Sequence, residues 1–129
     1  MNLYEELKTL LENAWAPYSG FRVASLVLSK EGRRFAGVNV ESAAYPTTMC
    51  AERNALFHAV AEGCRPGDIA EVHILAHDGE RLCEAFPCGS CRQVIAELSR
   101  NGADVYVYRA DGTAVRYTIA ELIPHAFTL

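Results

Sequence analysis

Three cysteines and one glutamate have the residue types and spacing needed for hydrolytic metal chemistry. Glu52 follows Cys50 by two residues, and Cys88 and Cys91 stand three residues apart further along the chain. Three thiolates can hold one zinc ion and leave its fourth position open for water, whereas a closed structural zinc site has four protein ligands. A carboxylate beside that open position can handle the protons of the water. The pattern therefore predicts a catalytic zinc site with Cys50, Cys88 and Cys91 as ligands and Glu52 as the acid–base group.

A Cys-x-x-Cys pair can also be a redox dithiol or one half of a structural zinc ribbon. The sequence has no second pair of this kind, and none of its four histidines stands at a ligand spacing from either motif. His58, for example, follows Cys50 by about two helical turns. Cys64 and Cys83 have no motif around them and are interpreted as structural. Catalytic zinc is the favoured hypothesis, and a non-enzymatic zinc or dithiol protein is the alternative from another class.

Size and composition are typical of one globular domain that spans residues 1–129. The formal net charge of −4 gives no reason to expect binding to nucleic acid. No apolar stretch is long enough to span a bilayer, and residues 1–6 lack the charge order of a signal peptide. The five cysteines are an odd number, which would leave one thiol unpaired in a secreted protein. In a reducing cytosol, clustered cysteines are more often metal ligands or catalytic groups. We therefore expect a cytoplasmic protein with no nucleic-acid or membrane partner.

The predicted elements alternate between helices and strands. Leucines at helical spacing predict a first helix within residues 3–14, and Cys50 opens a second helix that is apolar on nearly every side. A third helix is predicted from Cys88 and Cys91 to residue 101, and a short one before Pro124. Strands are predicted at residues 23–28, 34–40, 72–76, 105–108 and 115–118. The order predicts an α/β fold of α-β-α layers, with a mixed five-stranded sheet and helices on both faces.

Both cysteine motifs fall at predicted helix N-termini. The partial positive charge at a helix N-terminus stabilises thiolates, which are the form that zinc requires. One zinc ion with three thiolates still leaves a net negative charge, and this charge weakens the ion as a Lewis acid. Arg53, next to Glu52, is the candidate for compensating that charge from just outside the ligand set.

The two motifs together are similar to those of a known family. Cys50-Ala51-Glu52-Arg53, followed by residues Pro87-Cys88-Gly89-Ser90-Cys91-Arg92-Gln93, resembles the small homotetrameric cytidine deaminases. Residues 17–23, 39–41 and 123–127 resemble other segments of the same family. The chain departs from the family pattern at Pro46, where glycine is common, and at residues 42–44. Both departures lie beside the expected substrate and subunit contacts.

The resemblance implies a role for each matching residue. Glu52 would shuttle protons, and one zinc ion per subunit would be held by Cys50, Cys88 and Cys91. The remaining implied contacts concern the substrate. Asn39 and Glu41 would bind the ribose hydroxyls, Phe21 would pack against the pyrimidine, and the backbone N–H of Ala51 would contact its carbonyl oxygen. Tyr45 and Phe127 would complete the pocket of a neighbouring subunit in a homotetramer.

The expected activity is hydrolytic deamination of free cytidine and 2′-deoxycytidine to uridine and 2′-deoxyuridine, a reaction of pyrimidine salvage. A sister deaminase that acts on another aminopyrimidine compound, such as blasticidin S, is the alternative with the same zinc chemistry. The predicted ribose-binding pair Asn39 and Glu41 favours the nucleoside. A polynucleotide deaminase is disfavoured because it would need a basic and aromatic surface.

Overall fold

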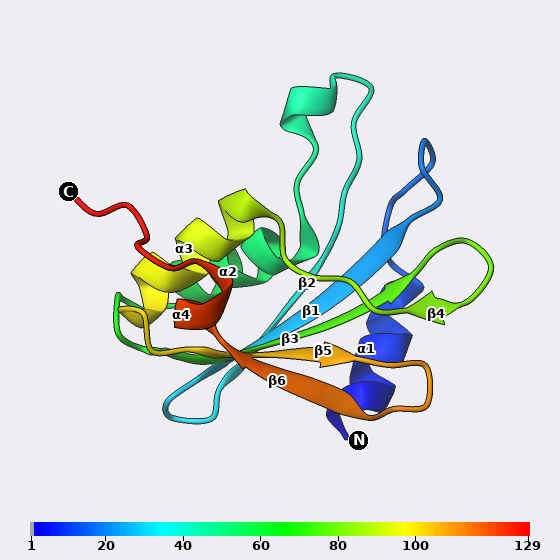
Figure 1. Ribbon diagram of the computed structural model, residues 1–129. Helices are drawn as coiled ribbons and strands as arrows, with labels where there is room; N and C mark the ends of the chain where they lie inside the picture. The colour runs from blue at the N-terminus through cyan, green and yellow to red at the C-terminus, as the bar shows by residue number, and fades with distance from the viewer. Residues whose placement is uncertain (1) are drawn as a thin grey trace.

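A six-stranded mixed sheet forms the centre of the computed structural model, which describes residues 2–129 (Figure 1). Its main path runs in the order β2-β1-β3-β5-β6. Only β3 and β5 pair in parallel, and every other pair is antiparallel. The strands are β1 (Arg22–Ser29), β2 (Arg34–Val38), β3 (Ile69–His77), β4 (Leu82–Cys83), β5 (Asp104–Tyr108) and β6 (Ala114–Thr118).

One face of the sheet is covered by α1 (Leu3–Leu11). Asn2 caps this helix, because its side-chain oxygen accepts a hydrogen bond of 2.8 Å from the backbone N–H of Glu5. Leu7 and Leu11 are buried on the side of the helix that faces the sheet, where they pack with Leu26. The helical spacing of the leucines therefore corresponds to one buried face, as the sequence predicted.

The other face carries α2 (Ala51–Ala61), α3 (Gly89–Ser99) and the short α4 (Ile119–Leu122), as Figure 1 shows. Cys50 and Cys88 are the N-cap residues of α2 and α3. The main hydrophobic core lies between these helices and the sheet. It includes Leu56 from α2 and Ile95 from α3, both fully buried. Both cysteine motifs thus begin helices, as predicted.

The five predicted strands are all present, and the layered arrangement with helices on both faces is confirmed. The sequence missed β4, which lies in the segment 78–86 that was interpreted as a polar connection. This two-residue strand pairs with Ala76 and His77 at the end of β3, beyond the part of β3 that pairs with β5. A strand this short has no periodicity of its own, and only its partner strand defines it.

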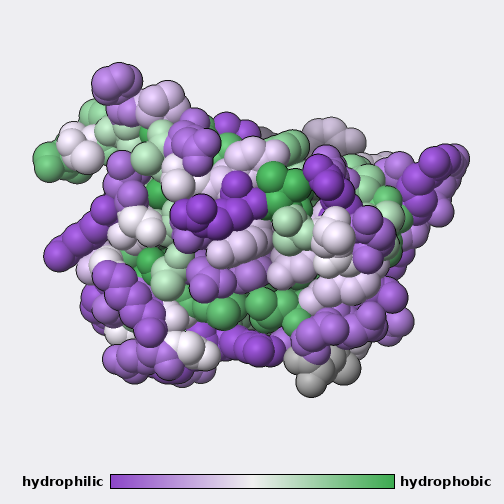
Figure 2. Space-filling model, turned by 60° about the horizontal axis from the view of Figure 1, so that its bottom comes forward, coloured by the Kyte–Doolittle hydropathy of each residue, from purple (hydrophilic) through white to green (hydrophobic). Residues whose placement is uncertain are grey.

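The face seen from below in Figure 2 is largely hydrophilic, with a few separate hydrophobic spots. Exposed aromatic side chains include Trp15 and Tyr18 in the loop before β1 and Tyr45 in the segment after β2. Among residues 2–129, no helix has the length and apolar character needed to cross a bilayer.

Candidate active site

The Sγ atoms of Cys50, Cys88 and Cys91 lie within 4.8 Å of one another. This is the only such metal-ligating group of side chains found in the described part of the chain. The fold assembles it by packing the N-terminus of α2 beside that of α3. Cys50 comes from the α2 cap position, Cys88 from the α3 cap position, and Cys91 from the first turn of α3. The structure thus brings together the three ligands that the sequence predicted.

The spacing of the sulfur atoms fits zinc. The Sγ atoms of Cys50 and Cys88 are 3.7 Å apart. Two thiolates bound to one tetrahedral zinc at the usual Zn–S length of 2.3 Å would be separated by about 3.8 Å. The three residues differ in their packing, because Cys91 is buried, Cys50 is half-buried and Cys88 is exposed. The donor set, with three sulfur atoms and an exposed side, is suited to a zinc ion that keeps one position free for a substrate or water.

Arg53 lies against the sulfur atoms. Its guanidinium Nη2 donates to the Sγ of Cys50 at 3.4 Å. Hydrogen bonds from the Cys91 thiol and from Arg53 lower the pKa of Cys50 to about 5. The bond between the two cysteines and the burial of Cys91 raise the pKa of Cys91. One thiolate therefore forms readily even without a metal ion, and Arg53 is placed to take up part of its negative charge.

Glu52 is buried beside this cluster, with only 5% of its surface exposed. Burial, with a smaller contribution from the negative charge of Cys50, raises the pKa of its carboxyl group to about 7. A carboxyl group with a pKa near neutrality can both accept and donate a proton at physiological pH, which general acid–base catalysis requires. Its position in the first turn of α2 follows directly from its place two residues after the Cys50 cap.

Gly37 allows α2 to approach the sheet closely enough to hold Cys50 and Glu52 in place. A Cβ atom on Gly37 would lie 2.4 Å from the backbone oxygen of Ala51 and 2.4 Å from the backbone nitrogen of Ala55. Asn54 adds a hydrogen bond of 2.8 Å from its side-chain nitrogen to the carbonyl of Val38. Neither residue was predicted from the sequence. A glycine inside a predicted strand is a known sign of close backbone approach and could have identified Gly37.

Gly37→Ala is expected to destabilise the protein by more than the roughly 1–3 kcal/mol typical of an overpacked core, because the clash is with backbone atoms. Gly89→Ala is the matched control, since nothing lies within 4 Å of the position that its Cβ would take. Urea unfolding of both variants measures the difference. Equal stability of the two variants would show that α2 moves away from β2 without cost.

Two polar residues named for substrate binding have well-defined partners. The side-chain oxygen of Asn39 accepts from the backbone N–H of Val23, and its side-chain nitrogen donates to the carbonyl of Phe21, both at 2.8 Å. Glu41 accepts hydrogen bonds from the backbone N–H groups of Tyr18 and Ser19 and from the Ser19 hydroxyl. These bonds, above all that from the Ser19 hydroxyl, lower the pKa of Glu41. Both residues therefore fix the loop before β1.

The segment after β2, which carries Asn39 and Glu41 and holds this loop, is connected to the cysteine cluster through the backbone. Val40 and Met49 exchange two hydrogen bonds, of 3.0 and 2.9 Å, and Met49 immediately precedes Cys50. Glu41 and Tyr45 line a pocket of about 290 Å³ together with Tyr18, Ser19 and Thr48. The segment that carries Asn39 and Glu41 is thus joined to the residue before Cys50, and Asn39 in turn bonds the carbonyl of Phe21. Tyr45 lies between Glu41 and Cys50, and Ala51 is the first residue of α2.

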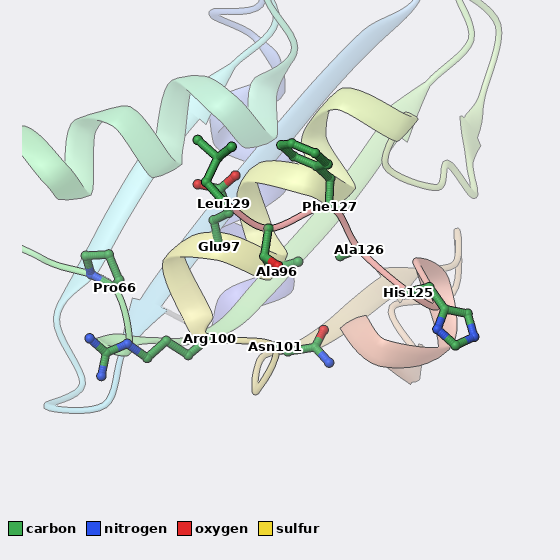
Figure 3. Close-up of a pocket in the computed structure, with 10 residues that line it drawn as sticks. Pro66, Ala96, Glu97, Arg100, Asn101, His125, Ala126, Phe127 and Leu129 are labelled. Carbon is green, nitrogen blue, oxygen red and sulfur yellow. The ribbon is translucent and has the colours of Figure 1, made fainter.

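Phe127 is the one predicted site residue that does not lie near Glu41 and Tyr45 within a single chain. It lines a different pocket, of about 740 Å³, between α3 and the C-terminal segment (Figure 3). The segment runs from His125 beside α4 across α3 to Leu129. The side chain of Phe127 is 65% exposed. Within a single chain, Phe127 is therefore separate from Tyr45.

Known proteins are similar to this chain in sequence and in fold. Residues 1–108 match the model of the cytidine and deoxycytidylate deaminase zinc-binding region. A cytidine deaminase of Halalkalibacterium halodurans is 42% identical over 98% of this chain and 92% of the relative, and one of Sporosarcina psychrophila is 39% identical over 98% and 89%. The crystal structure of a cytidine deaminase from Burkholderia pseudomallei superposes with a TM-score of 0.87, at 38% identity, over 97% of this chain and 96% of the other. The chain belongs to the family defined by the cytidine and deoxycytidylate deaminase zinc-binding region.

Proposed function

We propose that this protein hydrolyses free cytidine and 2′-deoxycytidine to uridine and 2′-deoxyuridine, releasing ammonia. The observation that carries the proposal is the group of three cysteine sulfur atoms with the buried Glu52 beside it, at the adjoining N-termini of α2 and α3. The relatives that share most of the chain are named cytidine deaminases, which supports the same substrate class here.

Cys50, Cys88 and Cys91 would hold the zinc ion. When bound, the ion supplies Lewis acidity that lowers the pKa of water in its open position. Glu52 accepts the proton that the water gives up and delivers it to N3 of the pyrimidine ring. Protonation of N3 makes C4 electrophilic, so that oxygen adds there. Glu52 then takes the remaining proton of the hydroxyl group on C4 and delivers it to the amino group. The C4 carbonyl forms as the C–N bond breaks and ammonia leaves.

The segments around the cluster would bind the nucleoside. Phe21, whose side chain is partly exposed, would pack on the pyrimidine. The N–H of Ala51 at the start of α2 has no partner within its own helix and would contact the carbonyl oxygen of the pyrimidine. Asn39 and Glu41 would bind the ribose hydroxyls with the hydrogen-bonding capacity that their loop contacts leave free. Thiolate ligands need a reducing environment, which supports a cytoplasmic location.

The direct test measures zinc content and ammonia release with cytidine, 2′-deoxycytidine and blasticidin S in parallel. We expect about one zinc per chain and turnover of both nucleosides. Turnover of blasticidin S alone would show that the protein is a deaminase with the same zinc chemistry but a different substrate. Stoichiometric zinc with no turnover of any of the three would contradict the enzymatic proposal.

Arg53→Ala is expected to lower kcat by about 10–100-fold, which is typical when a partner of the metal ligands is lost. Because Arg53 is not itself a ligand, zinc occupancy should fall much less than the rate. The physical reason is the hydrogen bond from its guanidinium to Cys50, which draws negative charge off the thiolate. Arg81→Ala, at an exposed position, is the control. An unchanged kcat in Arg53→Ala would show that Arg53 is a surface residue of the helix with no role at the metal site.

We also propose that the active protein is a homotetramer with pockets shared between subunits. The exposure of Phe127 and its separation from Tyr45 within one chain support a role against a neighbouring copy. A small chain with closed symmetry can bury such an aromatic side chain at a repeated interface.

Deletion of residues 127–129 should raise the KM for cytidine and leave the zinc content of each chain intact, because the ligands lie on α2 and α3. Deletion of residues 128–129, which retains Phe127, is the control. Mixing the longer deletion with a Glu52→Gln chain should restore part of the activity, since an intact Glu52 can then meet an intact Phe127. A monomer by sizing, or no recovery when subunits demonstrably exchange, would contradict the shared pocket.

A further inference from the structure

The first turn of α3 contacts two separate parts of the chain besides the cysteine cluster. Arg92, which directly follows the ligand Cys91, uses two nitrogens of its guanidinium. Nε donates to the carbonyl of Pro87 and Nη1 donates to the carbonyl of Leu122, both at 2.7 Å. One half-buried side chain therefore joins the loop that carries Cys88 to the end of α4, thirty residues away from Arg92.

The bond to Pro87 acts on the ligand that has the least packing. The carbonyl of Pro87 and the nitrogen of Cys88 belong to one planar peptide unit, so that holding the carbonyl also fixes the direction in which the chain enters Cys88. Cys88 is the exposed member of the three cysteines, and its side chain makes no capping bond to α3. Pro87 itself is buried. Arg92 thus supplies a constraint on Cys88 that packing does not.

The bond to Leu122 acts on the start of the C-terminal segment. After Leu122 the chain turns through His125, whose φ of +57° is unusual for a residue other than glycine, and then crosses α3 (Figure 3). Gln93, the neighbour of Arg92, donates from its side-chain nitrogen to the carbonyl of Phe127 at 2.8 Å. Two adjacent side chains of α3 therefore hold the chain just before this segment, at Leu122, and within it, at Phe127.

We propose that Arg92 is a positioning residue that couples the metal site to the C-terminal segment. Its guanidinium fixes the Pro87–Cys88 peptide for metal ligation and, through Leu122, the point from which the segment reaches Phe127. A planar fork with several donors can serve two carbonyls at once, whereas a lysine ammonium is a single point charge on a flexible stem. Any effect of this segment on substrate binding through Phe127 rests on the proposed function. The proposed constraint on the metal ligand Cys88 does not depend on the proposed function.

The test compares Arg92→Gln with Gln93→Ala, which removes the bond to Phe127 and a 3.0 Å side-chain bond to Glu97 on the same helix, and leaves both bonds of Arg92 in place. Three measurements need no substrate turnover: the rate of zinc transfer to a chelator, the thiolate-to-cobalt absorption of the Co²⁺-substituted protein, and amide hydrogen exchange over residues 123–129. For Arg92→Gln we expect zinc transfer about 10–100-fold faster, as for other partners of metal ligands. We also expect a shifted cobalt spectrum and faster exchange of the segment. Gln93→Ala should speed exchange of the segment and leave the zinc and cobalt measurements at the parent values.

Arg92→Gln with parent-like zinc transfer and cobalt absorption would overturn the proposal, because Arg92 would then anchor the C-terminal segment alone. Amide hydrogen exchange of residues 123–129 at the parent rate in Arg92→Gln would also overturn the proposal, because Arg92 would then act on the metal site alone. Should Arg92→Gln fail to fold, Arg92→Lys gives the same decision, because one ammonium group cannot hold both carbonyls in place. In Arg92→Lys, either the zinc and cobalt measurements or the amide exchange of residues 123–129 must then differ from the parent. Parent values in all three measurements would refute the coupling. If cytidine is not turned over at all, these three measurements still decide the question.

Discussion

Replacing Glu52 with glutamine is expected to remove nearly all turnover while the fold and the zinc content stay intact. Glutamine has almost the same shape as glutamate but cannot accept a proton and pass it on. General acid–base catalysis by one group is typically worth about 10²–10⁴-fold, and a larger loss is expected here because Glu52 serves several proton transfers. Its burial beside the sulfur cluster gives water little opportunity to replace it.

Steady-state ammonia release, with zinc content and circular dichroism on the same samples, measures this effect. Glu62→Gln is the matched control, because Glu62 ends the same helix with an exposed side chain. The control should retain the parent rate. If Glu52→Gln kept a rate within a few-fold of the parent, Glu52 would not be the proton carrier, and the mechanism would have to be assigned to another group.

The second large effect concerns the cysteines. Cys88→Ala and Cys91→Ala should lose both zinc and activity, because two thiolates and water hold the ion far more weakly than three thiolates. Cys64→Ser and Cys83→Ser should keep about one zinc per folded chain. Cys64 lies in the main core, and Cys83 lies in β4. Neither sulfur belongs to the group of three.

Zinc per folded chain is the deciding measurement, because Cys64→Ser places a hydroxyl in the core and is expected to lower stability on its own account. Metal analysis after removal of any aggregated protein separates stability from ligation. A metal-free but folded Cys64→Ser or Cys83→Ser chain would show that the ligand assignment is wrong.

Much of the fold was predictable because its signals are local. The leucines of α1 repeat at helical spacing, and the apolar runs of β1 and β3 exceed what a surface loop would carry. Gly63, with a φ of +104°, follows α2 where a helix ends with a left-handed residue. The short β4 was missed because pairing with β3, rather than its own sequence, makes it a strand.

The sequence by itself determined the chemistry of the candidate site. Cys50, Glu52, Cys88 and Cys91 lie at cap positions or in first turns of α2 and α3, where helical geometry alone sets the direction of a side chain. The prediction of two helix starts therefore placed all four residues correctly at helix N-termini, while their roles as metal ligands and acid–base group remain predictions. The sulfur positions of the structure agree with that prediction.

Only the tertiary structure decided how the two helices meet and what surrounds them. The contact of Gly37 with α2, the loop held by Glu41 and the two carbonyls held by Arg92 join residues that are distant in sequence. No periodicity encodes such pairs, because each depends on the shape of both partners. The same holds for Phe127, whose position away from Tyr45 follows from the path of the chain across α3 and from nothing in its own segment.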